Sequence, residues 1–455
     1  MMQHQLISHP ASLIHSQEEV FVRLVNRIMV GIFLLMIFDG SLRKWVLPSL
    51  SSPLILVKDA VVVWLYLLVF RAKKWPHHAM ANVGYLLALI FLGLMVLQLF
   101  NERLPLVNIF FGYRNYFLLL PLAFIMREYM GWEDIKRLAR IGCLIAIPSA
   151  ALVLIQVNSP VDAFINRSVG GDDDQVIFYV VAGVVRPYGF FSFTNGQAYF
   201  SIMALAMVCM NFLLATQDRF LKNWLAWVAA LAVLINIVTS GSRATFGMTI
   251  IMMGALALGG ITIIHTKEGF RIVLALILAL FATGFLASFL FSDNLEHMQE
   301  RVETASSQEG GTMNRVIRDN FILLDDIPEN LPLLGGGLGM GSAAAWRSMG
   351  NVTGLYLESE WVRVIYESGI LLGFAFMFYR LWLGFGTLFQ AIRILRLAKT
   401  PIPLLMILAI LQTVISGQMS FNNTSLYFGW FLLGLAMATN EAYKKSLLAS
   451  ETTRQ

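Results

Sequence analysis

Long apolar runs separated by short polar segments restrict the fold of this chain more than any other feature. Several runs hold about 18 or more residues, enough for a helix to cross the roughly 30 Å hydrocarbon core of a bilayer. A backbone in lipid must satisfy its hydrogen bonds within its own segment, so we expect helices rather than open strands. The hydrophobic content of 57% is also above that of a typical soluble domain. The sequence therefore predicts an all-α polytopic membrane protein with about twelve transmembrane helices.

Short basic segments between these runs indicate the orientation of the chain. With twelve spans they all fall on the side of the N-terminus: RAKK, REYMGWEDIKRLAR, DRFLKN, HTKEGFR, RILRLAK and the C-terminal YKK. Loops rich in Lys and Arg face the cytoplasm, so this side is predicted to be cytoplasmic. Arg43 and Lys44 are the exception, because the same topology puts them outside. Either the first helix is irregular there, or the two side chains have a function.

The predicted topology divides the chain into five parts. The spans cover about residues 28–38, 53–70, 79–100, 116–126, 141–157, 197–215, 224–239, 246–264, 272–291, 361–383, 402–416 and 426–438. The parts are a cytoplasmic tail at 1–23, helices one to nine within 24–291, a long outer loop with short helices at 292–357, helices ten to twelve within 358–441, and a cytoplasmic tail at 442–455. A second outer loop is predicted near 158–190.

Composition and motifs exclude several classes of protein. Cys143 and Cys209 both lie inside apolar runs, which predicts neither a disulfide framework nor a metal site. The net charge of +5 sits in short loops beside the spans, so no nucleic-acid partner is expected. The run Asp172–Asp174 has the oxygen ligands for a divalent cation, but a solvated acidic loop is the better interpretation. No metal and no cofactor are predicted.

The glycine cluster GGGLGMG, at residues 335–341, invites comparison with a dinucleotide-binding loop. It follows a proline-containing segment rather than a strand, and no βαβ pattern surrounds it, so that interpretation is rejected. Glycines in this density are expected to permit tight turns and close approach of the backbone to a ligand.

Arginines gather on the predicted outer side. A guanidinium stays charged and presents donors that match phosphate oxygens, so these residues suit a pyrophosphate on a lipid carrier. The alternative is that each arginine caps a helix or binds lipid headgroups. Arg315 and Arg318 are three residues apart and would share one face of an interfacial helix. The candidate substrate-binding residues are Arg114, Arg186, Arg243, Arg315 and Arg318.

Charged residues also open the tenth predicted span. Glu360, Arg363 and Glu367 have spacings of three and four, which put them on one helical face. Unpaired charges at such a depth are costly, so they are expected to face a cavity or one another. A salt-bridged ladder is one interpretation. The other is that a carboxylate, Glu358 or Glu360, takes a proton from a sugar hydroxyl as a general base.

Three further charges, Asp39, Lys58 and Asp59, lie at or near membrane depth. Pairing within the helix bundle is the plainer interpretation, and a proton or ion path is the alternative.

From Arg186 to Gly373 the chain resembles the bacterial O-antigen ligase and O-antigen polymerase superfamily. The similar features are RPYGFFSFTNG leading into a span, a span ending in SGSRAT, a long outer loop, a glycine turn, and a helix that enters with ESGILLGF. This resemblance implies a metal-independent, inverting, membrane-embedded glycosyltransferase of the GT-C kind. Its donor would be an undecaprenyl-pyrophosphate-linked oligosaccharide at the periplasmic face of the bacterial inner membrane. By position, Arg186, Arg243 and Arg315 or Arg318 would hold the pyrophosphate as it leaves.

One departure from the family pattern decides between its members. Ligases often carry a His-Asn pair nine residues before the Glu that corresponds to Glu367, and here those positions are Glu358 and Ser359. The missing histidine favours a polymerase that joins repeat units of an O-antigen or exopolysaccharide, with Glu358 or Glu360 as the base. Such an enzyme would contact membrane lipids and work beside a flippase and a chain-length regulator.

Three alternatives stay open. One is a ligase that transfers glycan to a lipid A-core or another acceptor. The second is a secondary transporter or lipid-glycan flippase, although no internal repeat of the transporter kind is visible in the sequence. The third, a purely structural membrane subunit, leaves the outer arginines without a role.

Overall fold

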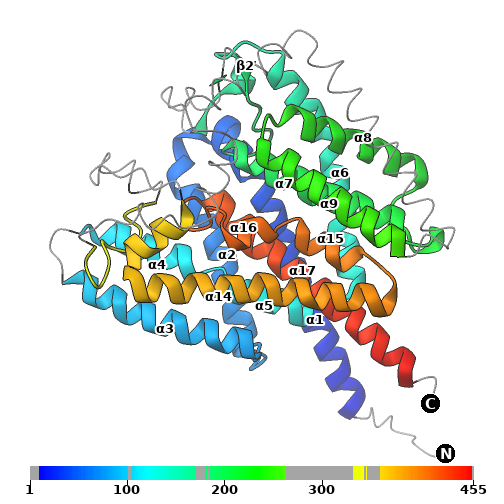
Figure 1. The fold of residues 1–455 in the computed structure, drawn as a ribbon, viewed down its shortest axis with the longest axis horizontal. Coiled ribbons are helices and arrows are strands. Elements are labelled where there is room, and N and C mark those ends of the chain that lie inside the picture. Colours follow the sequence, from blue (N-terminus) through cyan, green and yellow to red (C-terminus); the bar gives the residue numbers. More distant parts are fainter. Residues whose placement is uncertain are drawn as a thin grey trace, which may run out of the picture.

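The computed structural model describes residues 10–100, 104–169, 180–181, 184–262, 331–342, 345 and 359–452. Helices account for nearly all regular structure in these residues (Figure 1). The exception is one short antiparallel pair, β1 (Val180–Val181) with β2 (Val184–Val185). The all-α class predicted from the sequence is confirmed for the described part of the chain.

The helices follow one another along the chain with short connections. The first half contains α1 (Pro10–Ser41), α2 (Ser51–Arg71), α3 (Ala79–Leu99), α4 (Leu106–Phe117), α5 (Leu120–Tyr129) and α6 (Trp132–Val157). The second half contains α7 (Thr194–Leu213), α8 (Asn223–Thr239), α9 (Arg243–Thr262), α14 (Glu360–Ala398), α15 (Ile402–Leu408), α16 (Leu411–Ile415) and α17 (Asn423–Thr452).

Among the described residues, seven helical segments are long and apolar enough to cross a membrane. They are Gln17–Val46, Pro48–Arg71, Ala79–Leu99, Leu106–Tyr129, Trp132–Val157, Thr194–Leu213 and Glu360–Ala398. Two shorter apolar helices, Asn223–Thr239 and Ala244–Leu258, lie between the sixth and seventh. Every predicted span except 272–291 overlaps a described helix. That span and the predicted helices of the outer loop lie outside the described residues, so the count of twelve stays a prediction.

Helix α17 forms the centre of the bundle. It packs against α5, α14, α15 and α7, and its residues between Leu426 and Asn440 are buried. At Gly434 the backbones come close, because a Cβ there would lie 2.8 Å from the Cα of Ala123 on α5. Small residues let helices approach in this way in membrane proteins. Helices α6, α7 and α8 pack on one another beside this centre (Figure 1).

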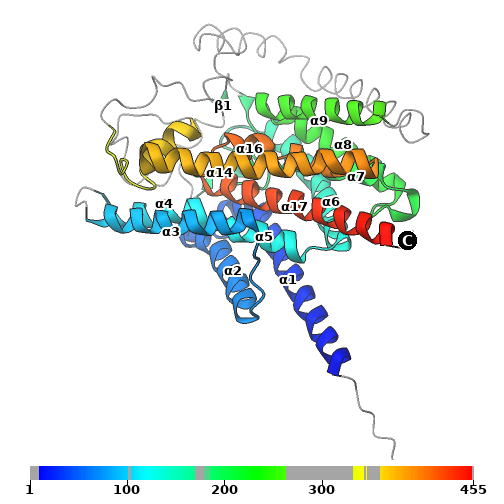
Figure 2. The same ribbon diagram turned by 60° about the horizontal axis from the view of Figure 1, so that its bottom comes forward.

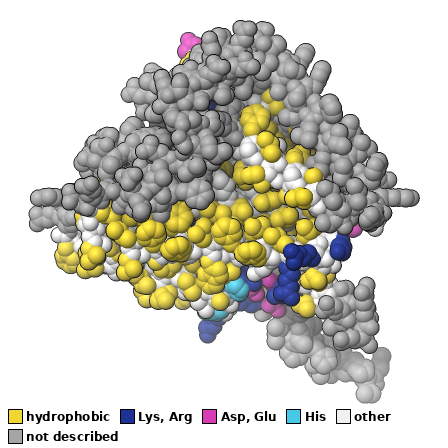
Figure 3. Space-filling view, in the orientation of Figure 1, with side chains coloured by type: hydrophobic (Ala, Val, Ile, Leu, Met, Phe, Trp, Pro, Cys, Tyr) yellow, Lys and Arg dark blue, Asp and Glu magenta, His cyan; other side chains and the backbone are white. Residues whose placement is uncertain are grey.

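The face seen in Figure 3 carries a broad band of apolar side chains. Helices α3 and α14 cross this face in Figure 1 and carry exposed apolar residues, among them Leu89 and Phe378. An apolar patch of this extent is expected on a surface that contacts lipid. Lys and Arg side chains gather near the end of the molecule that carries the chain termini (Figure 3).

Contacts define two ends of the bundle. At one end, which we call the termini end, Lys74 binds Glu18 and Arg127 binds Glu441. At the opposite end, the loop end, Lys44 binds the connection 186–193, and the segments 331–342 and 416–422 both bind carboxylates near the start of α14. Helices α1 and α2 pack together and are inclined to α3, α14 and α17 (Figure 2).

The helices are irregular close to the loop end. Helix α14 is broken at Gly369, whose φ of 78° and ψ of 164° are not helical. Ala409 and Ile410 separate α15 from α16 and so interrupt the helical conformation within one apolar segment. Helix α1 ends in a π-helical turn, Leu42–Val46, which contains Arg43 and Lys44. Broken helices at membrane depth need partners for their free backbone groups, and these partners form the candidate site.

Candidate functional site

The segment 420–427, SFNNTSLY, connects the elements of the loop end. It joins α16 to α17, and successive side chains contact different helices. Ser420 binds Glu360 on α14, Asn423 accepts a hydrogen bond from Arg114 on α4, and Tyr427 donates to Asp59 on α2. Ser192, in the connection before α7, bonds with Thr424. Two polar networks meet at this segment.

The first network is centred on Glu360, whose side chain is completely buried. Its Oε1 accepts hydrogen bonds from Arg380 Nη1 at 2.6 Å and from the Ser420 backbone N–H at 2.9 Å. Its Oε2 accepts from the Ser420 hydroxyl at 3.1 Å and from Arg363 Nη2. The ion pair with Arg363 is the salt-bridged arrangement that the spacing predicted.

A carboxylate with four donors and no exposed surface is poorly placed to receive a proton from a substrate. A general base must come within hydrogen-bond reach of the proton it abstracts. The geometry of Glu360 instead fits an anchor that joins α14 to the 420–427 segment. Its assignment as a possible base remains a prediction, which this geometry does not favour. Glu358 itself lies outside the described residues.

Arg380 is a member of this network that the sequence interpretation missed. Its Nε donates to the Val414 carbonyl, and its Nη2 donates to the carbonyls of Thr413 and Gly417, each at 2.9 Å. These carbonyls lie at the end of α16, where a helix leaves acceptors without partners. Arg380 therefore caps α16 while it pairs with Glu360. A lone arginine within FMFYRLWLG was the signal that could have identified it.

Glu367, which follows Glu360 and Arg363 on the same face of α14, is also buried. Its Oε2 accepts a hydrogen bond from the Tyr116 hydroxyl at 2.8 Å, and its Oε1 accepts one from the Gly341 N–H at 2.8 Å. Gly341 belongs to the glycine cluster. Glu367 thus joins α14 to both α4 and the glycine cluster.

The glycine cluster packs into the break of α14. Gly336 donates to the carbonyl of Tyr366 at 2.6 Å. The side chain of Gln98 on α3 holds the same region, because it donates to the carbonyls of Leu334 and Glu367 and accepts from the Leu338 N–H. These bonds satisfy backbone groups that the break at Gly369 leaves open.

Packing within the protein requires two of these glycines, Gly335 and Gly339. A Cβ on Gly335 would lie 2.6 Å from the carbonyl carbon of Glu367. A Cβ on Gly339 would overlap the carbonyl oxygen of Asn108 and lie 2.9 Å from the Cα of Gly112 on α4. Both glycines also have positive φ, 77° and 78°. The cluster does approach other backbone closely, at α4 and α14, and its predicted approach to a ligand stays a prediction.

The second network joins α1, α2 and α4. Lys58 pairs with Asp39 at 3.1 Å, and Arg114 pairs with both oxygens of Asp59 at 2.6 and 2.9 Å. Tyr427 donates a 2.6 Å hydrogen bond to Asp59. Pairing within the bundle, the plainer of the two interpretations, is what the structure has.

Arg114 is consequently occupied by protein partners. Besides Asp59, its Nη1 donates to the side-chain oxygens of Asn115 and Asn423. Asn115 in turn donates to the Ser420 carbonyl at 3.0 Å. Together with the following Tyr116, these consecutive residues of α4 reach both networks. This arrangement fits a framework role within the bundle, whereas the sequence interpretation weighed substrate binding against helix capping or lipid headgroups.

Arg43 and Lys44, the exception to the charge rule, are buried within the π-helical turn. Arg43 donates to the Ser51 carbonyl at 2.8 Å and pairs with Asp39. Lys44 donates to the carbonyls of Gly189 and Phe191, both at 2.8 Å. The first helix is therefore irregular at this point, and both side chains have structural partners. Lys44 fixes the connection that carries Arg186.

Arg186 lies beside the turn that precedes α9. Its Cγ and Nε are each 3.8 Å from the position that a Cβ on Gly241 would occupy. Gly241 has a φ of 56° and stands two residues before Arg243, the first residue of α9. The two sequence segments RPYGFF and SGSRAT are thus adjacent. The side chain of Arg243 lies outside the described part, as do Arg315 and Arg318.

The described residues contain no group of three or more His, Cys, Asp or Glu side chains that could hold a metal ion. Asp172–Asp174 lies outside these residues. Cys143 and Cys209 are free thiols, the first of them buried.

Comparison with known proteins does not assign the chain to a family. No family model matches it, and no curated protein matches its sequence.

Proposed function

We propose that this protein is a membrane-embedded glycosyltransferase that polymerises a polysaccharide from undecaprenyl-pyrophosphate-linked repeat units. The observation that carries the proposal is the approach of Arg186 to the Gly241 turn at the start of α9. The resemblance to O-antigen polymerases assigns the pyrophosphate to arginines of these two segments. They are more than fifty residues apart in sequence, and their adjacency is what a shared anion site requires.

The chemistry of this corner suits a pyrophosphate leaving group. Arg186 supplies a guanidinium, Arg243 supplies a second one in the sequence, and α9 begins at Arg243. A helix N-terminus also carries a partial positive charge that favours anions. Fixed donors of this kind stabilise the charge that develops as the glycosidic bond to the pyrophosphate breaks.

The two buried networks support the proposal because they form a structural framework beneath the site. Glu360 and Arg380 hold the end of α16, and Lys44 holds the carbonyls of Gly189 and Phe191. Catalytic groups need such supporting contacts to keep their geometry. In this scheme Arg114 belongs to the structural framework. Arg186 and Arg243 bind the substrate together with Arg315 or Arg318.

In the proposed reaction a sugar hydroxyl of the acceptor attacks the anomeric carbon of the donor. The new C–O bond forms as the bond from that carbon to the pyrophosphate oxygen breaks, with inversion. Glu358 takes the hydroxyl proton. It directly precedes Ser359, whose carbonyl accepts a hydrogen bond from the Arg363 N–H in the first turn of α14.

The experiment is an assay of purified protein in lipid with an undecaprenyl-pyrophosphate-linked repeat unit and no added metal. A ladder of longer lipid-linked glycans is expected from the wild type. Arg186→Ala should lose it, and Arg137→Ala, an exposed arginine at the termini end, should retain it. A ladder unchanged in both Arg186→Ala and Arg243→Ala would contradict the proposed site.

Two other functions would give different products in the same assay. Transfer to added lipid A-core without a ladder would identify a ligase. Movement of the lipid-linked glycan across vesicles without any new glycosidic bond would identify a flippase. The pairing of Asp39, Lys58 and Asp59 within the bundle does not favour the flippase, because these charges have protein partners.

A further inference from the structure

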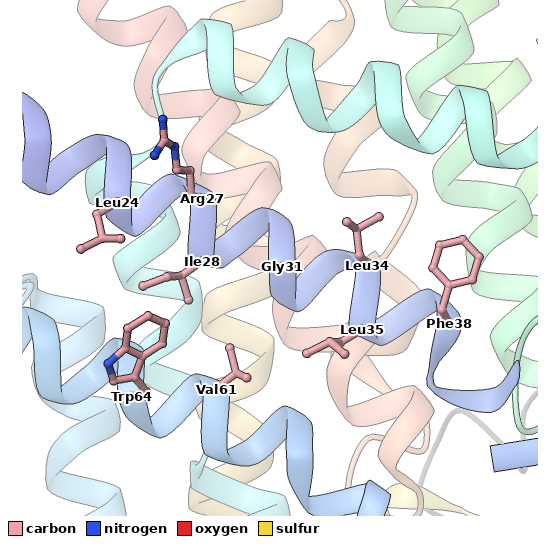
Figure 4. Close-up of a pocket in the computed structure, with 9 residues that line it drawn as sticks. All are labelled: Leu24, Arg27, Ile28, Gly31, Leu34, Leu35, Phe38, Val61 and Trp64. Atoms are coloured by element: carbon pink, nitrogen blue, oxygen red, sulfur yellow. The ribbon is translucent and has the colours of Figure 1, made fainter. Parts of the chain in front are cut away.

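A groove of about 590 Å³ runs between α1 and α2 (Figure 4). Its volume is within the range of pockets that hold small molecules. Arg27 is the one charged residue among those that line it; the others are apolar side chains and Gly31. Trp64 of α2 forms part of its wall and is 52% exposed.

Gly31 lies in the middle of the groove on α1 (Figure 4). A Cβ at this position would meet no atom within 4 Å. The glycine therefore does not serve close packing of helices within the described residues, unlike Gly434. Its missing side chain leaves a depression between the apolar residues on either side.

The groove has the length of one membrane leaflet. Arg27 and Phe38 are eleven residues apart on α1, which corresponds to about 16 Å along a helix. This is close to half of the roughly 30 Å hydrocarbon core. Arg27 is at the end directed toward the termini, and the Phe38 ring packs against Phe190 at the other, with ring centroids 5.1 Å apart.

Arg27 is exposed and has no hydrogen bond or ion pair with the residues that the structure describes. Nearby carboxylates bind other cations, since Glu19 pairs with Arg23 and Glu18 pairs with Lys74. A guanidinium at the edge of an apolar groove is complementary to a lipid phosphate, which it can bind through two parallel hydrogen bonds.

We propose that the α1–α2 groove binds an anionic phospholipid from the leaflet at the termini end. Arg27 binds its phosphate, and one acyl chain lies along Gly31 toward Phe38. An anionic headgroup is favoured over a zwitterionic one because the Arg27 guanidinium has no carboxylate partner among the described residues. This site is independent of the proposed glycosyl transfer at the loop end.

Trp64 provides the measurement, because bromine atoms on a bound acyl chain quench a neighbouring indole. Purified protein in detergent is titrated with phosphatidylglycerol or phosphatidylcholine that carries brominated chains. The chain has ten tryptophans, so the Trp64 signal is the difference between the wild type and Trp64→Phe. Phosphatidylglycerol is expected to quench this signal at a lower mole fraction, by about fivefold.

Variants test the two parts of the site separately. Arg27→Gln should abolish the preference for phosphatidylglycerol, whereas Arg23→Gln, a matched change of a paired arginine on α1, should reduce it less. Gly31→Leu should lower quenching by both lipids, and Gly93→Leu, on the exposed face of α3, should not.

Equal quenching by both lipids, unaffected by Arg27→Gln and Gly31→Leu, would overturn the proposal. Loss of a dimer in Gly31→Leu with unchanged quenching would show that a second copy occupies the groove instead.

Discussion

At the scale of single residues, Glu360 and Glu367 show how a carboxylate is accommodated inside this bundle. Their shared face with Arg363 follows from helical spacing, and the pair between Glu360 and Arg363 was predictable from it. The other partners of Glu360, Ser420 and Arg380, could not be predicted from the sequence. Ser420 is sixty residues away in sequence, and Arg380 acts through carbonyls of α16 that have no sequence signal.

The anchor role of Glu360 makes a prediction about stability. Glu360→Gln removes one charge but keeps the size of the side chain, which leaves Arg363 and Arg380 buried with no carboxylate between them. Breaking a buried ion pair in this way costs about 3–5 kcal/mol. The variant is expected to unfold at a lower temperature in detergent than the wild type, as measured by intrinsic fluorescence.

Glu358→Gln is the matched comparison. As the proposed base it should keep the stability of the wild type and lose glycan polymerisation. If Glu360→Gln were as stable as the wild type and inactive, Glu360 would be the base and its anchor role would be wrong.

At the scale of elements, the break in α14 and the glycine cluster form one unit. The sequence predicts tight turns and close backbone approach for GGGLGMG, because glycine tolerates positive φ and has no side chain. It does not indicate what the backbone approaches. The cluster lies more than two hundred residues from α4, and the break at Gly369 falls inside the segment 361–383, which the sequence analysis predicts as one span.

Gly339→Ala tests this unit. The added Cβ would overlap the Asn108 carbonyl oxygen, and the positive φ would be strained, so the protein should be destabilised by several kcal/mol. Thermal unfolding in detergent measures the effect.

Gly93→Ala is the control for Gly339→Ala, because a Cβ at Gly93 meets nothing within 4 Å on α3. It should be neutral, or stabilising by about 0.5–1 kcal/mol. Equal stability of the two alanine variants would mean that the cluster does not pack on α4.

At the scale of the whole molecule, the positions of the helices were predictable and their assembly was not. Apolar runs locate helices because length and hydropathy suffice for that. The role of α17 as the central helix, and of the 420–427 segment as the link between both networks, depends on contacts between distant parts of the chain. In the sequence this segment is only a polar gap between two apolar runs.

The predicted orientation of the whole molecule is tested by cysteine labelling. In a Cys143→Ala, Cys209→Ala background, Leu333→Cys places a thiol at the loop end, where Leu333 is 90% exposed. It should react with a membrane-impermeant maleimide in intact spheroplasts. Lys445→Cys, exposed near the C-terminus, should react only after permeabilisation. The reverse pattern would put the loop end in the cytoplasm and exclude transfer at the periplasmic face.

The most direct test of the account is the affinity of the purified protein for undecaprenyl pyrophosphate, measured by thermophoresis in detergent. Hydrogen bonds to a charged group contribute about 1.5–3 kcal/mol, so Arg186→Ala should raise the Kd by about 10- to 100-fold. Arg243→Ala should have a similar effect, and Arg137→Ala should have none. An unchanged Kd in both well-folded variants, Arg186→Ala and Arg243→Ala, would contradict a pyrophosphate site between RPYGFF and SGSRAT.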